Sequence, residues 1–442
     1  MAHSCKIGED LLVKILSSLP PKSLMRFKCA AKWWYAQINN PRFVDNQLSN
    51  CLHNNQSIFL KRLVPNKDPN ASETESVFSM LTFCEDVDDG AHTFLLSRVE
   101  DINVPVSMSV MSAGEELRIV GHCHGIICVH VDNYSKVFLW NPAIQEFKLL
   151  PSEKYFTDWE SIYQQHGPYL SLNRLGWAMG FGYDPISKAY KVVSIIFDGL
   201  QLHAHTLYSV VIYPLRVQVY TLGSSEESSS WREIKTYSLE TETTFLWPEN
   251  FEIYFKGMCY WLGTEQQKEF LDIHSEETRY DELIRQVMVS FDMSDEVFDE
   301  VALPDELPVH HTSYFGFFMK LRVWNESSIA LCVWVSRYDV IPYFGMWLMD
   351  DDFGACVWTK HAGFELASIP IMDLRDGGWA LPLWKSDELL VVDKDGCTIC
   401  YNLRTENRMS LPTVQICMPT LDPPIVVYVN SIVSIGLGRQ QT

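Results

Sequence analysis

The stretch GHCHGIICVHVDNYSKVFLWNPAIQEFKLLP, residues 121–151, carries the pattern that decides the fold. Short runs rich in Val, Ile, Phe and Trp are separated by turns that hold Gly, Asp, Asn, Pro or Ser, which is typical of short strands. One run ends in Trp140-Asn141, and a further strand, EFKLLP (146–151), follows after a turn. An Asn or Asp at such a strand end can cap the tight turn through its own side chain.

The aromatic–Asn/Asp strand end recurs along the chain, and a second strand follows it after a turn. The clearest copies are Tyr183-Asp184 with AYKVV (189–193), Phe291-Asp292 with VFDEVALP (297–304), and Tyr401-Asn402 with NRMSLP (407–412). Three or four strands per unit, at intervals of about fifty to seventy residues, predict a radial array of small antiparallel sheets. We therefore predict a β-propeller of about six to eight blades.

The ends of this β-rich region are expected to meet in one blade. The group VVYVNSIVSI (426–435) would complete a blade that begins near Ser57–Leu63. A two-sheet sandwich is the alternative architecture, but a region of nearly 400 residues is too long for a single sandwich.

The N-terminal run LLVKILSSLPPKSLMRFKCAAKWWYAQINNPRFV (11–44) has a helical pattern instead. Apolar residues recur at i, i+3, i+4 and i+7, as one face of a helix requires: Leu12, Ile15, Leu16 and Leu19. Pro20 ends this helix, and Pro21 suits the first turn of the next helix, where its missing N–H costs nothing. Because roughly 40 residues seldom support their own core, the spare apolar face is expected to need a docking partner.

This helical run resembles an F-box, the motif that docks on a Skp-type adaptor in cullin-based ubiquitin ligases. The matching positions are Leu11, Ile15, Leu19-Pro20, Lys22-Ser23-Leu24, Arg26-Phe27-Lys28-Cys29, Lys32, Trp34 and Pro41-Arg42-Phe43. Family members usually carry Cys and Ser where this chain has Ala31 and Trp33, which alters packing detail but leaves the apolar anchors. The alternative is an ordinary helical subdomain that packs on the rest of the chain.

The β-rich remainder resembles the F-box-associated domain of a large plant F-box group. The matching runs include LWNPAIQEFKLLP, GFGYDPISKAYKVV, KGMCYWLG, VSFDMSDEVFDEVALP and LWKSDELLVVDKDG. We therefore expect a mainly β protein, with a small α-helical F-box at 6–50 and a β-propeller-like F-box-associated domain at 57–436. The runs PPKSLMRFKC, INNPRFV, MGFGYDPISKAYKVV and VNSIVSI are most similar to S-locus F-box proteins, including the S-locus F-box brothers of the apple tribe.

Composition limits the possible classes of protein. The apolar share of 47% and aromatic share of 13% indicate a packed globular chain rather than a disordered one. No window is apolar enough to span a membrane, and the start lacks the apolar core of a signal peptide, so a cytoplasmic location is expected. The twelve cysteines lack framework spacing and are interpreted as reduced, mostly buried residues.

Charge is divided unevenly between the two predicted domains. Residues 1–50 hold seven Lys and Arg against three acidic residues, a net charge of +4. Since the whole chain carries −21, residues 51–442 carry −25. Such an acidic region disfavours nucleic acid and favours basic partners, although acidity of this kind can also serve solubility alone.

Groups that suggest catalysis or metal binding have structural explanations. His122 and His124 share one side of the predicted strand 121–129 while Cys123 faces away, which argues against a metal site. Cys397 and Cys400 have redox spacing but lie in a predicted strand rather than at a helix N-terminus. The nucleophile, phosphate-binding and zinc-protease motifs are absent from the sequence. We therefore predict a non-catalytic protein without a metal site or cofactor.

The resemblance implies the substrate-recognition subunit of an SCF-type (Skp–cullin–F-box) E3 ubiquitin ligase. Its partners would be a Skp-type adaptor and, through it, a cullin and a RING subunit. The expected adaptor anchors are Leu11, Ile15, Leu19, Pro20, Leu24, Phe27 and Trp34. Buried aromatic and aliphatic groups of this kind dominate such interfaces.

The S-locus resemblance also implies a target: basic, non-self S-RNases that are ubiquitinated and degraded in the pollen or pollen-tube cytosol during gametophytic self-incompatibility. Variable polar turns are expected to read the target, because loops on a rigid frame carry specificity. The candidate residues are Glu85, Asp86, Asp88, Asp89, Asp158, Glu160, Glu276, Glu277, Asp351 and Asp352. The alternatives are an SCF receptor for a different plant protein and, from another class, a propeller enzyme.

Overall fold

The computed structural model describes twenty-two stretches of the chain. They are residues 9–54, 57–65, 74–88, 91–111, 117–131, 136–152, 170–204, 207–212, 215–223, 230–235, 239, 244–267, 285–307, 317–324, 328–335, 343–352, 355–365, 379–382, 388–392, 397–402, 408–416 and 425–436. The chain forms two compact units, one of Met1–Leu150 with Leu421–Thr442 and the other of Pro151–Thr420. The predicted domain limits, 6–50 and 57–436, differ from the limits of these two units and stay a prediction.

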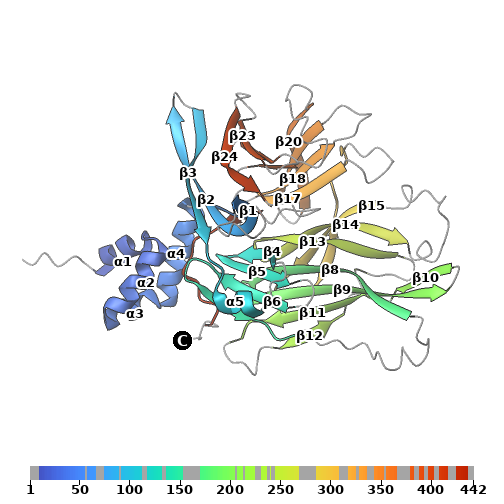
Figure 1. Ribbon diagram of the computed structural model, residues 1–442, viewed down its shortest axis with the longest axis horizontal. Coiled ribbons are helices and arrows are strands. Elements are labelled where there is room, and N and C mark those ends of the chain that lie inside the picture. Colours follow the sequence, from blue (N-terminus) through green and yellow to red (C-terminus); the bar gives the residue numbers. More distant parts are fainter. Residues whose placement is uncertain are drawn as a thin grey trace, which may run out of the picture. The chain divides into compact units, whose positions relative to one another are not determined.

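The first unit begins with four helices (Figure 1): α1 Glu9–Ser17, α2 Pro21–Ala30, α3 Lys32–Ile38 and α4 Pro41–Asn54. Pro20 is extended, as expected of a residue that precedes a proline, and α2 begins at Pro21. Ala31 is also extended and separates α2 from α3. The helical character that the sequence predicts for this run is confirmed.

The helices share a small apolar core. Its buried members are Leu16, Leu24, Ile38, Phe43 and, from the far end of the chain, Ile432. Leu12, Leu19 and Trp34 are half-buried against this core. The helical period of the sequence therefore places one apolar face inward, and the C-terminal residue Ile432 completes the cluster.

The first unit also contains two groups of antiparallel strands and a short helix, α5 (Val106–Met111). One group is β1 (Ser57–Pro65), β2 (Thr74–Asp88), β3 (Ala91–Ile102) and β25 (Ile425–Tyr428); the other is β4 (Leu117–Cys123), β5 (Ile126–Val131), β6 (Lys136–Asn141) and β7 (Glu146–Leu149). β25 pairs with β1 through the register Ser57↔Tyr428 to Leu60↔Ile425. The predicted meeting of the two ends of the β region is confirmed.

The second unit contains four antiparallel groups in chain order. They are β8 (Leu170–Asp184), β9 (Ala189–Ala204), β10 (Leu207–Ile212), β11 (Arg216–Thr221) and β12 (Trp231–Ile234); β13 (Thr244–Phe255), β14 (Met258–Gln267), β15 (Arg285–Asp292) and β16 (Phe298–Val301); β17 (Phe317–Val323), β18 (Ser328–Val335), β19 (Tyr343–Asp352) and β20 (Ala355–Glu365); and β21 (Trp379–Pro382), β22 (Glu388–Val392), β23 (Cys397–Asn402) and β24 (Arg408–Ile416). Each group pairs strands that follow one another closely in sequence, as propeller blades do.

The mainly β fold class is confirmed, and the six groups make five sheets, because the groups of β1 and of β24 belong to one eight-stranded sheet. The strands thus form a five-blade β-propeller arrangement. The predicted number of six to eight blades is wrong. Long strands explain the difference: β8 has 15 residues and β9 has 16, so a blade uses more chain than the short strands of the sequence pattern imply. Within the described ranges, no helix has the length and apolar character needed to cross a bilayer.

The predicted caps at strand ends are confirmed at three of the repeated positions. Asn141 Oδ1 accepts a hydrogen bond from Ala143 N at 3.0 Å. Asp184 Oδ1 accepts from Ile186 N, and Asp292 Oδ1 accepts from Ser294 N. Each polar side chain therefore satisfies backbone donors of the turn that follows it.

One close approach ties two sheets of the second unit together. An added Cβ at Gly180 in β8 would lie 2.5 Å from Cζ2 of Trp261 in β14, a distance that real contacts do not allow. Trp261 is fully buried, and its indole Nε1 donates to Met179 O at 3.1 Å. The missing side chain of Gly180 thus makes room for the indole ring in the core of these sheets.

Candidate functional site

The N-terminal helices expose several large apolar side chains. Of the ten large apolar side chains that are exposed within the described ranges, five lie on α1–α3: Leu11, Ile15, Phe27, Trp33 and Tyr35. Their exposed fractions run from 37% for Phe27 to 58% for Tyr35. We call these five residues the helical apolar face. Several exposed apolar side chains on one small helical segment are typical of a surface that binds another molecule.

The helical period explains why these side chains point outward. Leu11 and Ile15 are four residues apart and share one side of α1, whereas Leu16 points into the core. Along α3, Ile38 is buried and Trp34 half-buried, which leaves Trp33 and Tyr35 directed elsewhere. The inward face of each helix is thus occupied, and a second apolar face remains.

Trp34 links the aromatic members of this face. Its ring centroid lies 5.4 Å from that of Phe27 and 4.7 Å from that of Trp33, the latter edge-on at 75°. Tilted and edge-on ring pairs at such distances are favourable. The contacts hold Phe27 and Trp33 in place beside a half-buried ring, so this part of the face is formed before any partner arrives.

The same helices carry basic residues on α2 and α3. Lys22 forms an ion pair with Glu100, so its charge is partly compensated within the first unit. Lys28 is half-buried, and this burial lowers the pKa of its ammonium group, while Glu146 opposes the shift. Arg26 and Lys32 are exposed on α2 and α3. A partner with acidic groups around an apolar patch would complement this surface.

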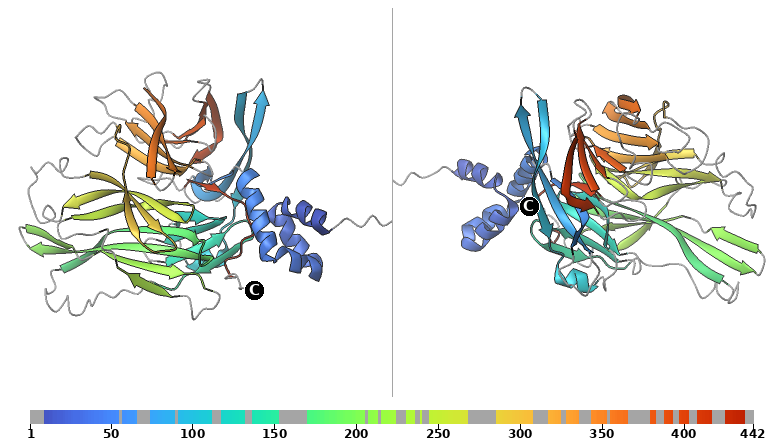
Figure 2. Two further views of the ribbon diagram at one scale, coloured as in Figure 1. Left: turned by 180° about the vertical axis from the view of Figure 1, so that it is seen from behind. Right: turned by 45° about the horizontal axis from the view of Figure 1, so that its top comes forward.

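The chain's own C-terminal segment runs beside the helices (Figure 2) and contacts them. Gln47 in α4 is fully buried; its Nε2 donates to Asn430 O at 3.4 Å and its Oε1 accepts from Ile432 N at 3.2 Å. The sequence predicts that the spare apolar surface needs cover. The structure divides that surface: one part is closed from within the chain, and the helical apolar face stays open.

The predicted adaptor anchors differ in exposure: some lie on the surface of the helices and one lies in their core. Leu11, Ile15, Pro20 and Phe27 are exposed, and Leu19 and Trp34 are half-buried. Leu24 is 0% exposed and lies in the helical core, so it supports the surface from beneath and does not lie on it. The sequence reasoning missed Trp33 and Tyr35, although the departure from the family at position 33 was a usable signal.

The predicted target-binding residues fall into two groups. Asp89, Asp158, Glu160, Glu276 and Glu277 fall outside the described residues. Glu85, Asp86 and Asp88 belong to β2, and Asp351 and Asp352 to the end of β19, with only their backbone described. Their role in target binding stays a prediction.

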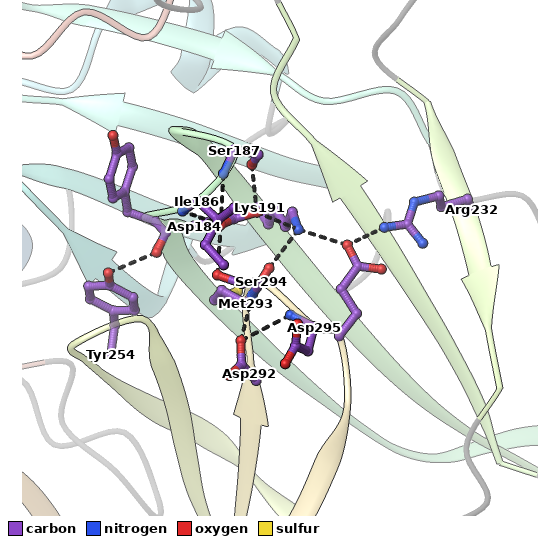
Figure 3. Close-up of polar contacts among 12 residues, drawn as sticks. Asp184, Ile186, Ser187, Lys191, Arg232, Tyr254, Asp292, Met293, Ser294 and Asp295 are labelled. Atoms are coloured by element: carbon purple, nitrogen blue, oxygen red, sulfur yellow. Dashed lines mark hydrogen bonds and ion pairs between the residues drawn. The ribbon is translucent and has the colours of Figure 1, made fainter.

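A second group of polar residues joins two turns of the second unit (Figure 3). Lys191 Nζ lies 2.9 Å from Asp184 Oδ2 and 2.8 Å from Glu296 Oε1, and it donates to Met293 O at 2.5 Å. Asp184 Oδ1 also accepts from Ser294 Oγ at 2.8 Å. Arg232 completes the group through an ion pair with Glu296.

The electrostatics of this group favour its charged form. Burial of Asp184 raises the pKa of its carboxyl, but hydrogen bonds from Ser187, Lys191 and Ser294 outweigh burial and hold that pKa well below its usual range. Burial likewise raises the pKa of Glu296, and bonds from Arg232 and Lys191 bring it below the usual range. Because each carboxylate is already paired, we interpret the group as an internal brace of the two turns.

The structure brings no metal-binding or redox group together among the residues it describes. No cluster of three or more His, Cys, Asp or Glu side chains able to hold a metal occurs in those ranges. His124 lies in the turn after β4 with a φ of 52°, not in a strand beside His122 as expected. Cys397 and Cys400 lie in β23, as predicted, and Cys400 is buried.

Comparison with known proteins identifies the class of this chain. Residues 80–366, more than half of its length, match the family described as the F-box associated beta propeller domain. The chain therefore belongs to that family of F-box-associated proteins.

The curated relatives agree with this class. The chain is 25% identical over 384 residues to the F-box/kelch-repeat protein At3g23880 of Arabidopsis thaliana, which covers 87% of this chain and 84% of that protein. It is 22% identical to the F-box protein At3g07870 of the same plant, over 88% of this chain and 85% of the relative. A match to Arabidopsis At3g16210, also named for an F-box, is 28% identical but covers 43% and 41%. These similarities support a plant F-box protein.

Solved structures add nothing to the argument. The tricorn protease, for example, covers 84% of this chain and 36% of its own at 9% identity and a TM-score of 0.33. Likeness at that level carries no inference about fold or function.

Proposed function

We propose that this protein is the substrate-recognition subunit of an SCF-type E3 ubiquitin ligase. The observation that carries the proposal is the helical apolar face, which the chain leaves open in a family of F-box-associated proteins. A Skp-type adaptor would cover this face and connect the chain to a cullin and a RING subunit. The β region would hold the protein that is to be ubiquitinated.

The mechanism needs no bond-making by this chain. A receptor that holds a target beside a ubiquitin-loaded enzyme converts a bimolecular encounter into an effectively intramolecular one. Binding and rigid placement are then the functions that its residues perform. The fully paired charges of the brace at Asp184, Lys191 and Glu296 suit such placement, because they fix two turns without offering a reactive group.

For the target we propose basic S-RNases in the pollen cytosol, within gametophytic self-incompatibility. The net charge of −25 over residues 51–442 favours association with a basic protein. The test measures binding of the purified adaptor complex to a panel of stylar ribonucleases at two salt concentrations. Salt-sensitive binding supports this target, whereas adaptor binding without ribonuclease binding assigns the receptor to a different plant protein.

The adaptor interface is tested by Ile15→Asp. Ile15 is exposed, so the substitution places a charge on the helical apolar face without entering the helical core. We expect adaptor affinity to fall by at least about tenfold, because central apolar anchors dominate such interfaces. Calorimetry with a purified Skp-type adaptor measures the change.

Val357→Asp provides the matched control. Val357 is also a large exposed apolar residue, at 55%, but it lies on β20 in the second unit. This variant should bind the adaptor as the parent chain does. Equal affinity of Ile15→Asp and the parent chain would remove the proposed interface.

A further inference from the structure

The segment Ile425–Gly436, which we call the C-terminal strap, contacts several parts of the first unit that lie far away in the sequence. It pairs with β1 as β25, it approaches the turn between β4 and β5, and it reaches the helices through Ile432. We propose that the N-terminal helices depend on the C-terminal strap for their order. These helices then acquire their native packing only once the strap has docked on the strands of the first unit.

The helical core is too small to close without the strap. Four of its five buried members come from the helices, and the fifth is Ile432, which is 2% exposed. Loss of one large aliphatic side chain from a core of this size leaves a cavity comparable to the core's own members. A short helical segment without that contribution has little apolar burial to offset the entropy of ordering.

The polar contacts of α4 require the same segment. Gln47 is buried, and its amide group exchanges hydrogen bonds with the strap at Asn430 O and Ile432 N. Without the strap these bonds are lost, and a buried amide loses its main-chain partners on that side. The helices and the strap therefore depend on each other through both apolar and polar contacts.

The β region holds the strap in position. Asn141 Nδ2 donates to Ser431 O at 3.2 Å and to Val433 O at 2.8 Å. Glu146 Oε1 accepts from Ser434 Oγ at 2.8 Å and from Gly436 N at 2.9 Å. These anchors lie on β6 and β7. The strands therefore fix the position of the strap, and the strap in turn fixes the helices that it contacts.

Gly125 allows the strap to lie close to the β4–β5 turn. Its φ is +82°, and an added Cβ would lie 2.4 Å from Val429 O and 2.5 Å from Ser431 Oγ. Any side chain at this position would displace the strap and strain the turn. The position therefore provides a way to move the strap without changing a residue that contacts the helices.

The first experiment compares Ile432→Ala with Ile435→Ala in the full chain by hydrogen–deuterium exchange. Both isoleucines are buried in the strap, but only Ile432 belongs to the helical core. We expect amides of α1–α4 to exchange at least about tenfold faster in Ile432→Ala than in Ile435→Ala. Equal protection of the helices in the two variants would overturn the proposal.

A second pair of variants acts at a distance from the helices. Gly125→Ala should also accelerate exchange in α1–α4, because it displaces the strap. Gly257→Ala is its control: Gly257 has a φ of +87° and lies in the β13–β14 turn of the second unit, where an added Cβ would meet Pro185 at 3.4 Å. Unchanged helix exchange in Gly125→Ala, with the strap itself deprotected, would contradict the proposal.

This inference is independent of the proposed adaptor. If the proposed function holds, Ile432→Ala should also weaken adaptor binding, because the helical apolar face rests on the helical core. If Ile432→Ala accelerates exchange in the helices but the parent chain binds no adaptor, the dependence of the helices on the strap is supported and the ligase role is refuted. If the parent chain binds the adaptor but Ile432→Ala leaves exchange in the helices unchanged, the ligase role is supported and the dependence on the strap is refuted.

Discussion

The N-terminal helices and the sheets β8–β16 bury their apolar residues with very different completeness. The sheets share a core of fifteen buried residues, all supplied by the second unit, and Trp261 lies at 0% exposure within it. The core cluster of the helices has four buried residues from the helices and a fifth, Ile432, from the C-terminal segment, and α1–α3 leave five large apolar side chains exposed. The first arrangement buries its apolar residues within the second unit, whereas the second leaves exposed the surface that we propose an adaptor covers.

Polar groups show the same contrast. In the second unit, Lys191 is 6% exposed and has two carboxylates and a carbonyl oxygen as partners. On α2 and α3, Arg26 and Lys32 are exposed among apolar neighbours. A buried charge whose hydrogen bonds are all satisfied makes its surroundings rigid. An exposed surface with apolar and charged side chains is suited to binding, so we interpret the second unit as the more rigid part and the helices as the binding part.

The largest effect on the second unit is expected from Lys191→Met. It removes the cation and leaves the side chains of Asp184 and Glu296, 3% and 14% exposed, without their shared partner. We expect the free energy of unfolding to fall by about 3–5 kcal/mol, as for other broken buried ion pairs. Chemical denaturation measures the loss. Lys188→Met, an exposed change in the same turn, should stay within about 0.5 kcal/mol; equal effects of the two variants would refute the brace.

Acid should weaken the second unit through the same group. The pKa values of Asp184 and Glu296 lie below their usual range in the folded chain, so their stabilisation is complete above the ordinary carboxyl pKa of about 4. It is lost as pH falls from that value toward the lowered pKa values. Denaturation midpoints at pH 7 and below pH 4 test this. The pH dependence should be smaller in Lys191→Met, and an unchanged dependence would argue against the assignment.

The smallest effect on stability is expected at the helical apolar face. Tyr35→Gln removes a ring that is 58% exposed, so the free energy of unfolding should change by no more than about 0.5 kcal/mol. Adaptor binding should weaken, since exposed aromatic residues are frequent anchors. Thermal unfolding and calorimetry measure the two quantities. A large loss of stability would mean that Tyr35 serves the fold, and the contrast between the two regions would then weaken.

Much of the fold could be predicted because its signals are local. The 3.6-residue period placed the helices, and the aromatic–Asn/Asp strand ends predicted the caps that Asn141, Asp184 and Asp292 make. The pairing of β1 with β25 followed from an unpaired strand pattern at each end. The blade number could not be predicted, because the lengths of β8 and β9 depend on cross-strand pairing rather than on local pattern.

The candidate site was only partly predictable for a related reason. Helical phase alone does not say which of two apolar faces is covered, so Leu24 was grouped with the exposed anchors although it is buried. Its cluster includes Ile432, about four hundred positions away. Lys191 gave no signal either: a lysine in a β pattern suggests a solvent-facing position, and its partner Glu296 lies about a hundred positions away, in the turn between β15 and β16.

The close packing of Gly180 against Trp261 has an evolutionary consequence. Neither position can change size by itself, since a methyl group at 180 collides with the indole and a smaller residue at 261 leaves a void. Descendants of this sequence are therefore expected to alter the two positions jointly, exchanging volume between neighbouring sheets, and a substitution at one should be tolerated only after its counterpart has appeared.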